Sequence, residues 1–189
     1  MPAAGAVRLV RDFVNTYEPQ VGAEELTTPE QLGEWLAQRQ LLAAGTRLRP
    51  ADLATAVTVR EGLRAVLRTH AGHPADPAAL AALNQALAPV RPAFTADGYR
   101  LLAAGGPAFD RALAALIDAV RQAAEDGTWT RLKVCERDTC RWAFYDDSRN
   151  RVRRWCSMAG CGNHVKMRRA YTARTRRRRG EQADTPPAT

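Results

Sequence analysis

Residues 131–164 read RLKVCERDTCRWAFYDDSRNRVRRWCSMAGCGNH, and this stretch holds all four cysteines of the 189-residue chain. The cysteines form two pairs with four residues inside each pair, and fifteen residues separate the pairs. Two close pairs joined by an insert the size of a hairpin can bring four thiolates to one tetrahedral ion. The stretch therefore predicts one structural Zn²⁺, bound by Cys135, Cys140, Cys156 and Cys161.

Three other interpretations of the cysteines stay open. Disulfides belong mostly to secreted chains, and this N-terminus has no basic segment followed by the apolar core of a signal peptide. Free thiols buried for packing are not expected to gather in so short a window. His164 is a further candidate for the fourth zinc ligand, because it follows Cys161 closely.

Positive charge is concentrated in the same part of the chain. Residues 129–180 contain 16 basic and 4 acidic residues, whereas residues 1–128 contain 12 basic and 14 acidic residues. A zinc ion with four thiolates has a formal charge of about −2, and nearby arginines stabilise it. The arginines exceed that need, which predicts a polyanionic partner. A solvated basic face is the alternative.

The candidate nucleic-acid contacts are polar or basic residues around the second cysteine pair and in the helix expected after it. Arginines in this position can bind phosphates, and a basic helix can enter the major groove. Asn163 is expected to cap that helix, while Trp142 and Trp155 are expected to pack around the zinc. The candidates are Arg141, Arg149, Arg151, Arg153, Arg154, Asn163, His164, Lys166, Arg168 and Arg169.

The pattern V-C-x4-C-R-W-A-F-Y-D, followed by S-R-N-R and R-R-W-C-S-M-x2-C-G-N, resembles the CGNR-type zinc finger. In that family of bacterial stress-induced transcription regulators, the finger follows a helical region called the ABATE domain. The segment D-F-V-N-T at residues 12–16 is also similar to the family. The resemblance implies a transcription regulator and favours DNA over RNA as its partner. One departure is His164, which stands where the family has the arginine of CGNR.

The rest of the chain predicts a helical bundle with one short hairpin. Thr28, Pro29 and Gln31 form a capping box at one helix start, and Asp97-Gly98 is a tight-turn signal between strands at 92–101. His70 and His73 are interpreted as surface residues at a helix end. Helices are expected at 7–16, from Pro29 to before Gly45, from Pro50 to Gly72, from Pro77 through Leu87, and from Pro107 to Asp126.

The predicted fold is therefore mainly α. A helical ABATE-like domain with a short β-hairpin is expected at 1–128. A small treble-clef or ribbon-like zinc finger, with two short strands and a basic helix, is expected at 129–175. A basic and then disordered tail is expected at 176–189.

Two polar residues in the first helix, Asp12 and Asn15, have two interpretations. They are candidates for lining a small-molecule pocket, and the alternative is that they hold neighbouring backbone groups. A pocket there would make the helical domain a sensor of an effector ligand, and homodimerisation is a second role for that domain. The sequence contains no grouped catalytic residues, so we do not expect an enzyme with a merely structural finger.

The sequence as a whole predicts a cytoplasmic, DNA-binding transcription regulator. No apolar run approaches the length of a membrane span, and four free thiolates suit a reducing compartment. No membrane partner is therefore expected. An RNA- or ribosome-associated zinc protein using the same basic patch is the alternative from another functional class.

Overall fold

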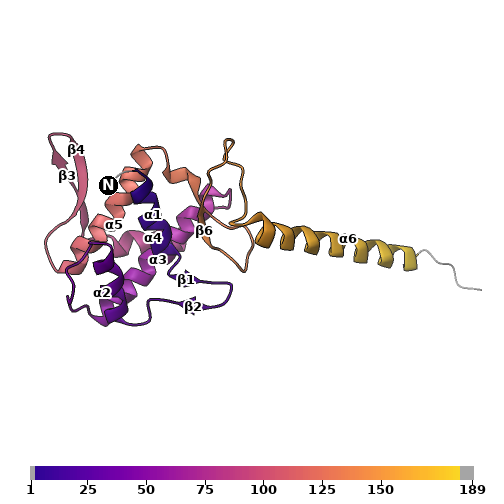
Figure 1. Cartoon of the computed structure of the whole chain (residues 1–189), viewed down its shortest axis with the longest axis horizontal. Coiled ribbons are helices and arrows are strands. Elements are labelled where there is room, and N and C mark those ends of the chain that lie inside the picture. The colour runs from indigo at the N-terminus through magenta and orange to yellow at the C-terminus, as the bar shows by residue number, and fades with distance from the viewer. Residues whose placement is uncertain (1–2, 184–189) are drawn as a thin grey trace, which may run out of the picture.

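The computed structural model describes the chain from residue 3 to residue 183, with side chains from 5 to 175. A compact helical part lies beside the zinc-finger segment, and the last helix projects away from both (Figure 1). No helix in this described part of the chain is long and apolar enough to cross a membrane.

The helices of the first part begin where their capping signals predict. At Thr28 the capping box is complete: the hydroxyl accepts the Gln31 N–H at 3.3 Å and the Gln31 side chain accepts the Thr28 N–H at 3.1 Å. Asp76 caps its helix through the N–H groups of the second and third helical residues. The bounds are α1 Ala3–Val14, α2 Pro29–Gln38, α3 Pro50–His70, α4 Pro77–Ala86 and α5 Ala108–Glu125.

The core of the helical part forms around α1, which packs against both α5 and α3. Phe13, Leu67 and Leu116 are among its fully buried side chains. Gly62 brings α4 close to α3, because a Cβ atom at that position would lie 2.6 Å from the Leu83 Cβ. Close packing of this kind excludes water from large apolar side chains and stabilises the fold.

Two hairpins extend from the helical part. The predicted one pairs β3 (Val90–Thr95) with β4 (Gly98–Ala103), and Gly98 adopts φ 128° in its turn. The second pairs β1 (Tyr17–Glu18) with β2 (Ala23–Glu24), and the sequence did not predict it because strands of two residues leave no alternating pattern. Arg60 fixes this hairpin through a bidentate ion pair with Glu24 at 2.6 and 2.7 Å.

The two strands of the zinc finger pack into the core of the helical part. A 3-10 turn at Trp129–Arg131 leads into β5 (Leu132–Val134), which pairs with β6 (Ala143–Tyr145) as predicted. Leu132, Val134 and Ala143 of this hairpin belong to the same buried cluster as the apolar side chains of α1 and α3. The finger is therefore not attached by a free linker but shares its core with the helices.

Two polar side chains of the helical part fasten the finger strands. Asn15 is buried and uses its whole amide group on Ala143, donating to the carbonyl oxygen at 2.9 Å and accepting the N–H at 2.8 Å. His70 contacts the Leu132 carbonyl oxygen through Nδ1 at 2.8 Å and packs edge-on against Trp129. His70 is half-buried and not the free surface residue that was predicted, because the finger strand β5 packs against α3.

We expect Asn15→Ala to lower the free energy of unfolding by about 2–4 kcal/mol, because the Ala143 N–H and carbonyl would be left buried without partners. Chemical denaturation of the zinc-loaded chain measures this loss. Asp12→Ala is the matched control: it removes only a partly exposed ion pair with Arg11, so it should cost less than about 1 kcal/mol. Equal losses in the two variants would contradict the clamp.

Candidate metal centre and basic surface

Each cysteine pair lies on a tight backbone turn. In the first, Cys140 donates its N–H to the Arg137 carbonyl at 2.8 Å, and Arg141 then takes a left-handed φ of 49°. The second is a turn of π-helix at Met158–Gly162, which leads into α6 (Asn163–Ala183). Ser157 caps this turn by accepting the Gly160 N–H at 3.1 Å, so the prediction that Asn163 caps the helix is wrong. These turns aim the thiols at one point.

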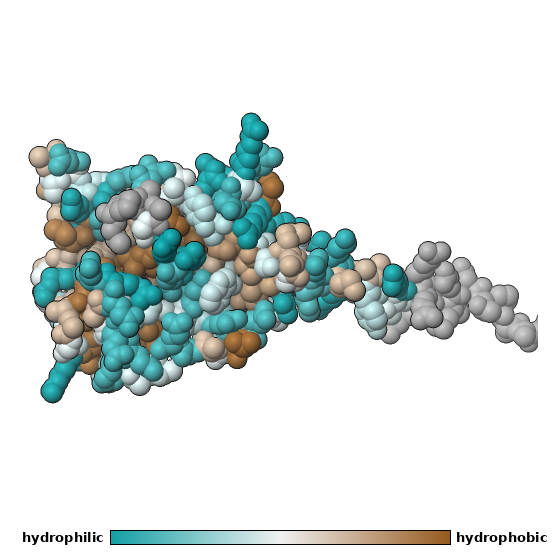
Figure 2. All heavy atoms as spheres, in the orientation of Figure 1, coloured by the Kyte–Doolittle hydropathy of each residue, from teal (hydrophilic) through white to brown (hydrophobic). Residues whose placement is uncertain are grey.

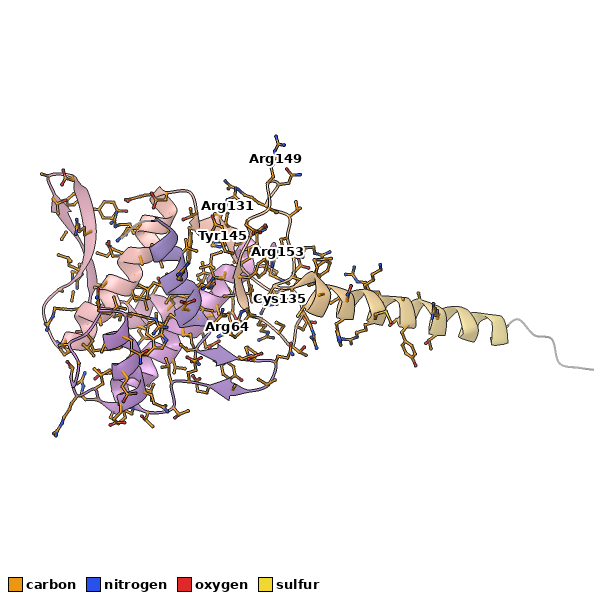
Figure 3. The ribbon with its side chains drawn as sticks, in the orientation of Figure 1. Arg64, Arg131, Cys135, Tyr145, Arg149 and Arg153 are labelled. Atoms are coloured by element: carbon orange, nitrogen blue, oxygen red, sulfur yellow. The ribbon has the colours of Figure 1, made fainter. Side chains whose placement is uncertain are left out.

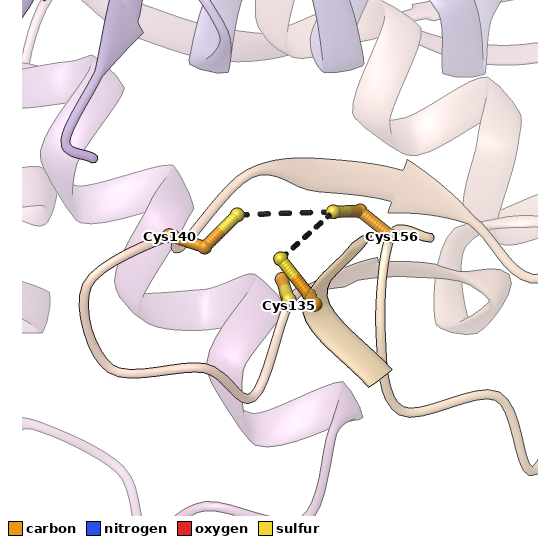
Figure 4. A group of neighbouring side chains, drawn as sticks. Cys135, Cys140 and Cys156 are labelled. Carbon is orange, nitrogen blue, oxygen red and sulfur yellow. Dashed lines mark hydrogen bonds between the residues drawn. The ribbon is translucent and has the colours of Figure 1, made fainter. Parts of the chain in front are cut away.

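The four thiols fit a tetrahedral zinc ion. Their Sγ atoms all lie within 4.8 Å of one another. Cys156 Sγ is 3.7 Å from Cys140 Sγ and 3.8 Å from Cys161 Sγ, as Figure 4 shows for the first contact. Zn–S bonds of about 2.3 Å in a tetrahedron require sulfur atoms about 3.8 Å apart. The chain thus holds one structural zinc, with three of the four ligands buried.

The thiols also show why the cluster requires a cation. A hydrogen bond from the Cys140 thiol lowers the pKa of Cys135. In turn, the hydrogen bonds to Cys135 raise the pKa of Cys140 and of Cys156. Four thiolates this close repel one another unless a positive ion lies between them. Zinc supplies that charge, and its binding releases the remaining thiol protons.

Arg137 supplies further positive charge to the cluster and connects it to the helical part. Its Nη1 lies 3.9 Å from Cys161 Sγ and donates to the Gln20 side chain at 3.2 Å. Gln20 lies in the loop of the β1–β2 hairpin. The sequence indicated arginines around the zinc, but only the fold brings this loop to the cluster.

A buried carboxylate organises the loop between the two cysteine pairs. Asp146 has no exposed surface and accepts hydrogen bonds from Lys133 Nζ at 2.8 Å and from the backbone N–H groups of Ser148 and Arg153. Burial would raise the pKa of Asp146, but these hydrogen bonds outweigh it and lower the pKa to about 2. Lys133 also donates to the Arg151 carbonyl. This pair was not predicted from the sequence, although Asp146 ends the F-Y-D motif.

Arginines of the predicted contact set divide into two groups. Arg153 donates to the carbonyl oxygens of Trp155 and Cys156, and Arg154 pairs with Glu136. Both guanidinium groups thus have partners within the finger, although Arg154 is exposed to solvent. Arg149 and Arg151 are exposed on the loop as well, and Figure 3 shows Arg149 pointing away from the chain.

The remaining predicted contacts lie on or near α6. Arg141 is exposed beside the first turn and donates to the Asp138 carbonyl at 3.1 Å. The predicted contacts that lie on α6 all have exposed side chains, and they are Asn163, His164, Lys166, Arg168 and Arg169. The His164 side chain is not part of the four-thiol cluster.

Two grooves flank the finger. The first, of about 490 Å³, lies between residues 136–139 and the side of α6 that carries His164, Arg168 and Arg169. The second, of about 580 Å³, lies between the helical part and the finger, and both Asp12 and Asn15 line it. We call it the junction groove; its other walls are Arg11, Glu25, Arg39, Trp142, Ala143, Phe144, Tyr145, Asp147, Arg153 and Cys156.

The purified chain is expected to contain one zinc ion, and Cys156→Ser to lower the zinc content to near zero, because three thiolates bind the ion far more weakly. Elemental analysis by mass spectrometry gives the ratio of metal to protein. Full occupancy in Cys156→Ser would contradict the four-thiolate site and would point to His164 as a ligand.

Asp146→Asn should destabilise the zinc-loaded chain by about 3 kcal/mol, because the buried Lys133 ammonium would lose its counter-ion. It should also speed tryptic cleavage within residues 149–151, since the loop loses its anchor. Asp147→Asn is the control, because that side chain is exposed and its ion pair with Arg153 is long at 3.3 Å. Unchanged stability and cleavage in Asp146→Asn would refute the anchoring role.

Comparison with known families agrees with this architecture. The ABATE family, described as "Putative stress-induced transcription regulator", matches residues 7–133. The CGNR zinc finger family matches residues 131–179, so the two matches overlap at the strand β5 that both parts share. Among curated proteins, none matches the chain. Because the first match covers more than half of the sequence, the chain belongs to the ABATE family, and its second part is a CGNR zinc finger.

Proposed function

We propose that this regulator binds duplex DNA through the 149–151 loop and helix α6. The observation that carries the proposal is the form of α6, which projects from the finger as a long basic helix (Figure 1). Its 21 residues give it a length of about 31 Å. No acidic residue occurs from Asn163 to Arg179, and Glu181 near the far end is the one acidic residue of α6, so most of the helix meets a polyanion without opposing charge.

The surface of α6 suits the major groove. Most of its visible surface is hydrophilic, with a few apolar spots (Figure 2). Met167 and Tyr171 are 70% and 72% exposed, and their four-residue spacing, together with Arg174 three residues on, places them on one face. A major groove about 12 Å wide admits an α-helix, and apolar side chains can contact thymine methyl groups there. This face of α6 is the one that we propose contacts the base edges.

The exposed loop arginines suit the phosphate backbone. Arg149 and Arg151 lie on a loop whose base is fixed by the buried Asp146, so they are displayed on an ordered support. Such contacts raise affinity for every sequence and do not discriminate between bases. The zinc cluster holds the loop and the start of α6 together, which makes them one binding surface.

The helical domain is assigned to sensing a small-molecule effector. The support is the junction groove, which touches both α1 and the finger strand β6, so a ligand there would contact both parts. The Asn15 amide is already used on Ala143, which leaves Arg11 and Asp12, paired with each other, as the polar groups of α1 that a ligand in the groove could contact. Homodimerisation remains a prediction.

Replacement of both loop arginines by glutamine should weaken binding to all duplexes alike. The slope of log K against log salt should become shallower by about 2, because each neutralised phosphate contributes about 0.9. Fluorescence anisotropy with labelled duplexes at several salt concentrations measures both quantities. Arg8→Gln with Arg47→Gln is the matched control: it removes the same charge from exposed sites in the helical domain.

Three results would count against the proposal. An unchanged salt slope in the Arg149→Gln, Arg151→Gln variant would exclude phosphate contacts by the loop. An equal effect of the control pair would mean that the net charge of the protein, and not the position of the loop arginines, determines the affinity. Tighter binding to RNA than to duplex DNA of the same length would favour the RNA-associated alternative.

A further inference from the structure

The four zinc thiolates differ in their access to solvent. Cys135, Cys140 and Cys161 are 3%, 6% and 5% exposed, whereas Cys156 is partly exposed. Of these four, Cys156 is the one that lines the junction groove. Cys161 differs further, because the Arg137 guanidinium approaches its sulfur at 3.9 Å and draws on its electron density.

We propose that Cys156 is an oxidation site at which a small hydroperoxide, entering through the junction groove, disassembles the zinc cluster. The groove is about 580 Å³ in volume, ample for hydrogen peroxide. Zinc keeps the Cys156 sulfur deprotonated, and a thiolate is the form that attacks peroxides. All four zinc-bound sulfur atoms carry the same charge, so exposure to solvent decides which of them reacts.

The second sulfur is already in place. Cys156 Sγ lies 3.7 Å from Cys140 Sγ and 3.8 Å from Cys161 Sγ. A disulfide requires a separation of about 2.05 Å, so a small movement of the turns suffices once the ion is gone. Cys140 is the favoured partner, because Cys161 is drawn toward Arg137.

The reaction balances with one hydroperoxide per chain. The Cys156 thiolate attacks one peroxide oxygen, the O–O bond breaks, and a sulfenic acid forms as hydroxide leaves. The Cys140 thiolate then attacks the sulfenic sulfur, the S–O bond breaks, and an S–S bond forms as a second hydroxide leaves. Two thiolates lose two electrons, hydrogen peroxide gains them, and two protons from solvent complete two waters. The two remaining thiols no longer hold the ion.

Loss of the ion would act on the base of α6. The turn at Met158–Gly162 carries Cys161 and packs Met158 against Gly162. With Cys161 released, this turn loses its link through the metal to the first cysteine pair and is held only through Cys156 and its new disulfide, so α6 is fixed less firmly relative to the 149–151 loop. The site rests on the zinc cluster and not on DNA binding, so the two proposals can fail separately.

The test uses the zinc-loaded, full-length chain and hydrogen peroxide below one equivalent. A colorimetric chelator records zinc release, and a sulfenic-acid probe followed by differential alkylation and mass spectrometry records the order in which cysteines are modified. We expect Cys156 to be modified first, one zinc to be lost per chain oxidised, and a Cys140–Cys156 disulfide to accumulate. Dithiothreitol with added zinc should restore the original metal content.

Met158→Leu serves as the control variant, because Met158 is 61% exposed beside the cluster and its thioether can also be oxidised. It should release zinc at the wild-type rate. First modification at Cys135, Cys140 or Cys161 would overturn the proposal. So would zinc release with all four thiols intact, or release that Met158→Leu abolishes.

Discussion

The structure depends on one constraint, namely that the zinc finger is too small to bury a core of its own. Its hairpin solves this by packing Leu132, Val134 and Ala143 into the core of α1 and α3. An apolar face that enters another domain brings backbone polar groups with it, and those groups need partners. Asn15 and His70 provide them at Ala143 and Leu132. The finger and the helical domain are thereby one folded unit.

Zinc then has a narrower task than in an isolated finger. The hairpin is held by the shared core, so the ion fixes what lies beyond it: the two cysteine turns, the connecting loop and the start of α6. The buried Lys133–Asp146 pair supports the same loop from the other side. The finger therefore combines a hairpin that is firmly attached to the helices with an outer surface that depends on the metal, and that outer surface is the one proposed to bind DNA.

The junction groove links the three properties proposed for this protein, namely DNA binding, effector sensing and oxidation of the zinc cluster. It borders α1 of the helical domain, the finger strand β6 and the zinc ligand Cys156. A ligand that filled it would contact Asn15 on one side and Cys156 on the other. An effector and an oxidant would thus act at the same place. Either one would influence α6 indirectly, through the parts of the finger that border the groove.

The sequence by itself determined the zinc ligands, the helix starts at Thr28 and Asp76, the β3–β4 turn and the clustering of basic residues. Each of these features depends on residues that are close together in the chain. Family resemblance at the cysteine motif added the two-domain arrangement. Only the tertiary structure decided that Asn15 clamps Ala143 across 128 residues, that His70 contacts the finger strand at Leu132, and that Arg153 and Arg154 bond to groups of the finger while Arg149 points away from it. Such pairings depend on which surfaces meet when the core closes, and sequence periodicity carries no record of that.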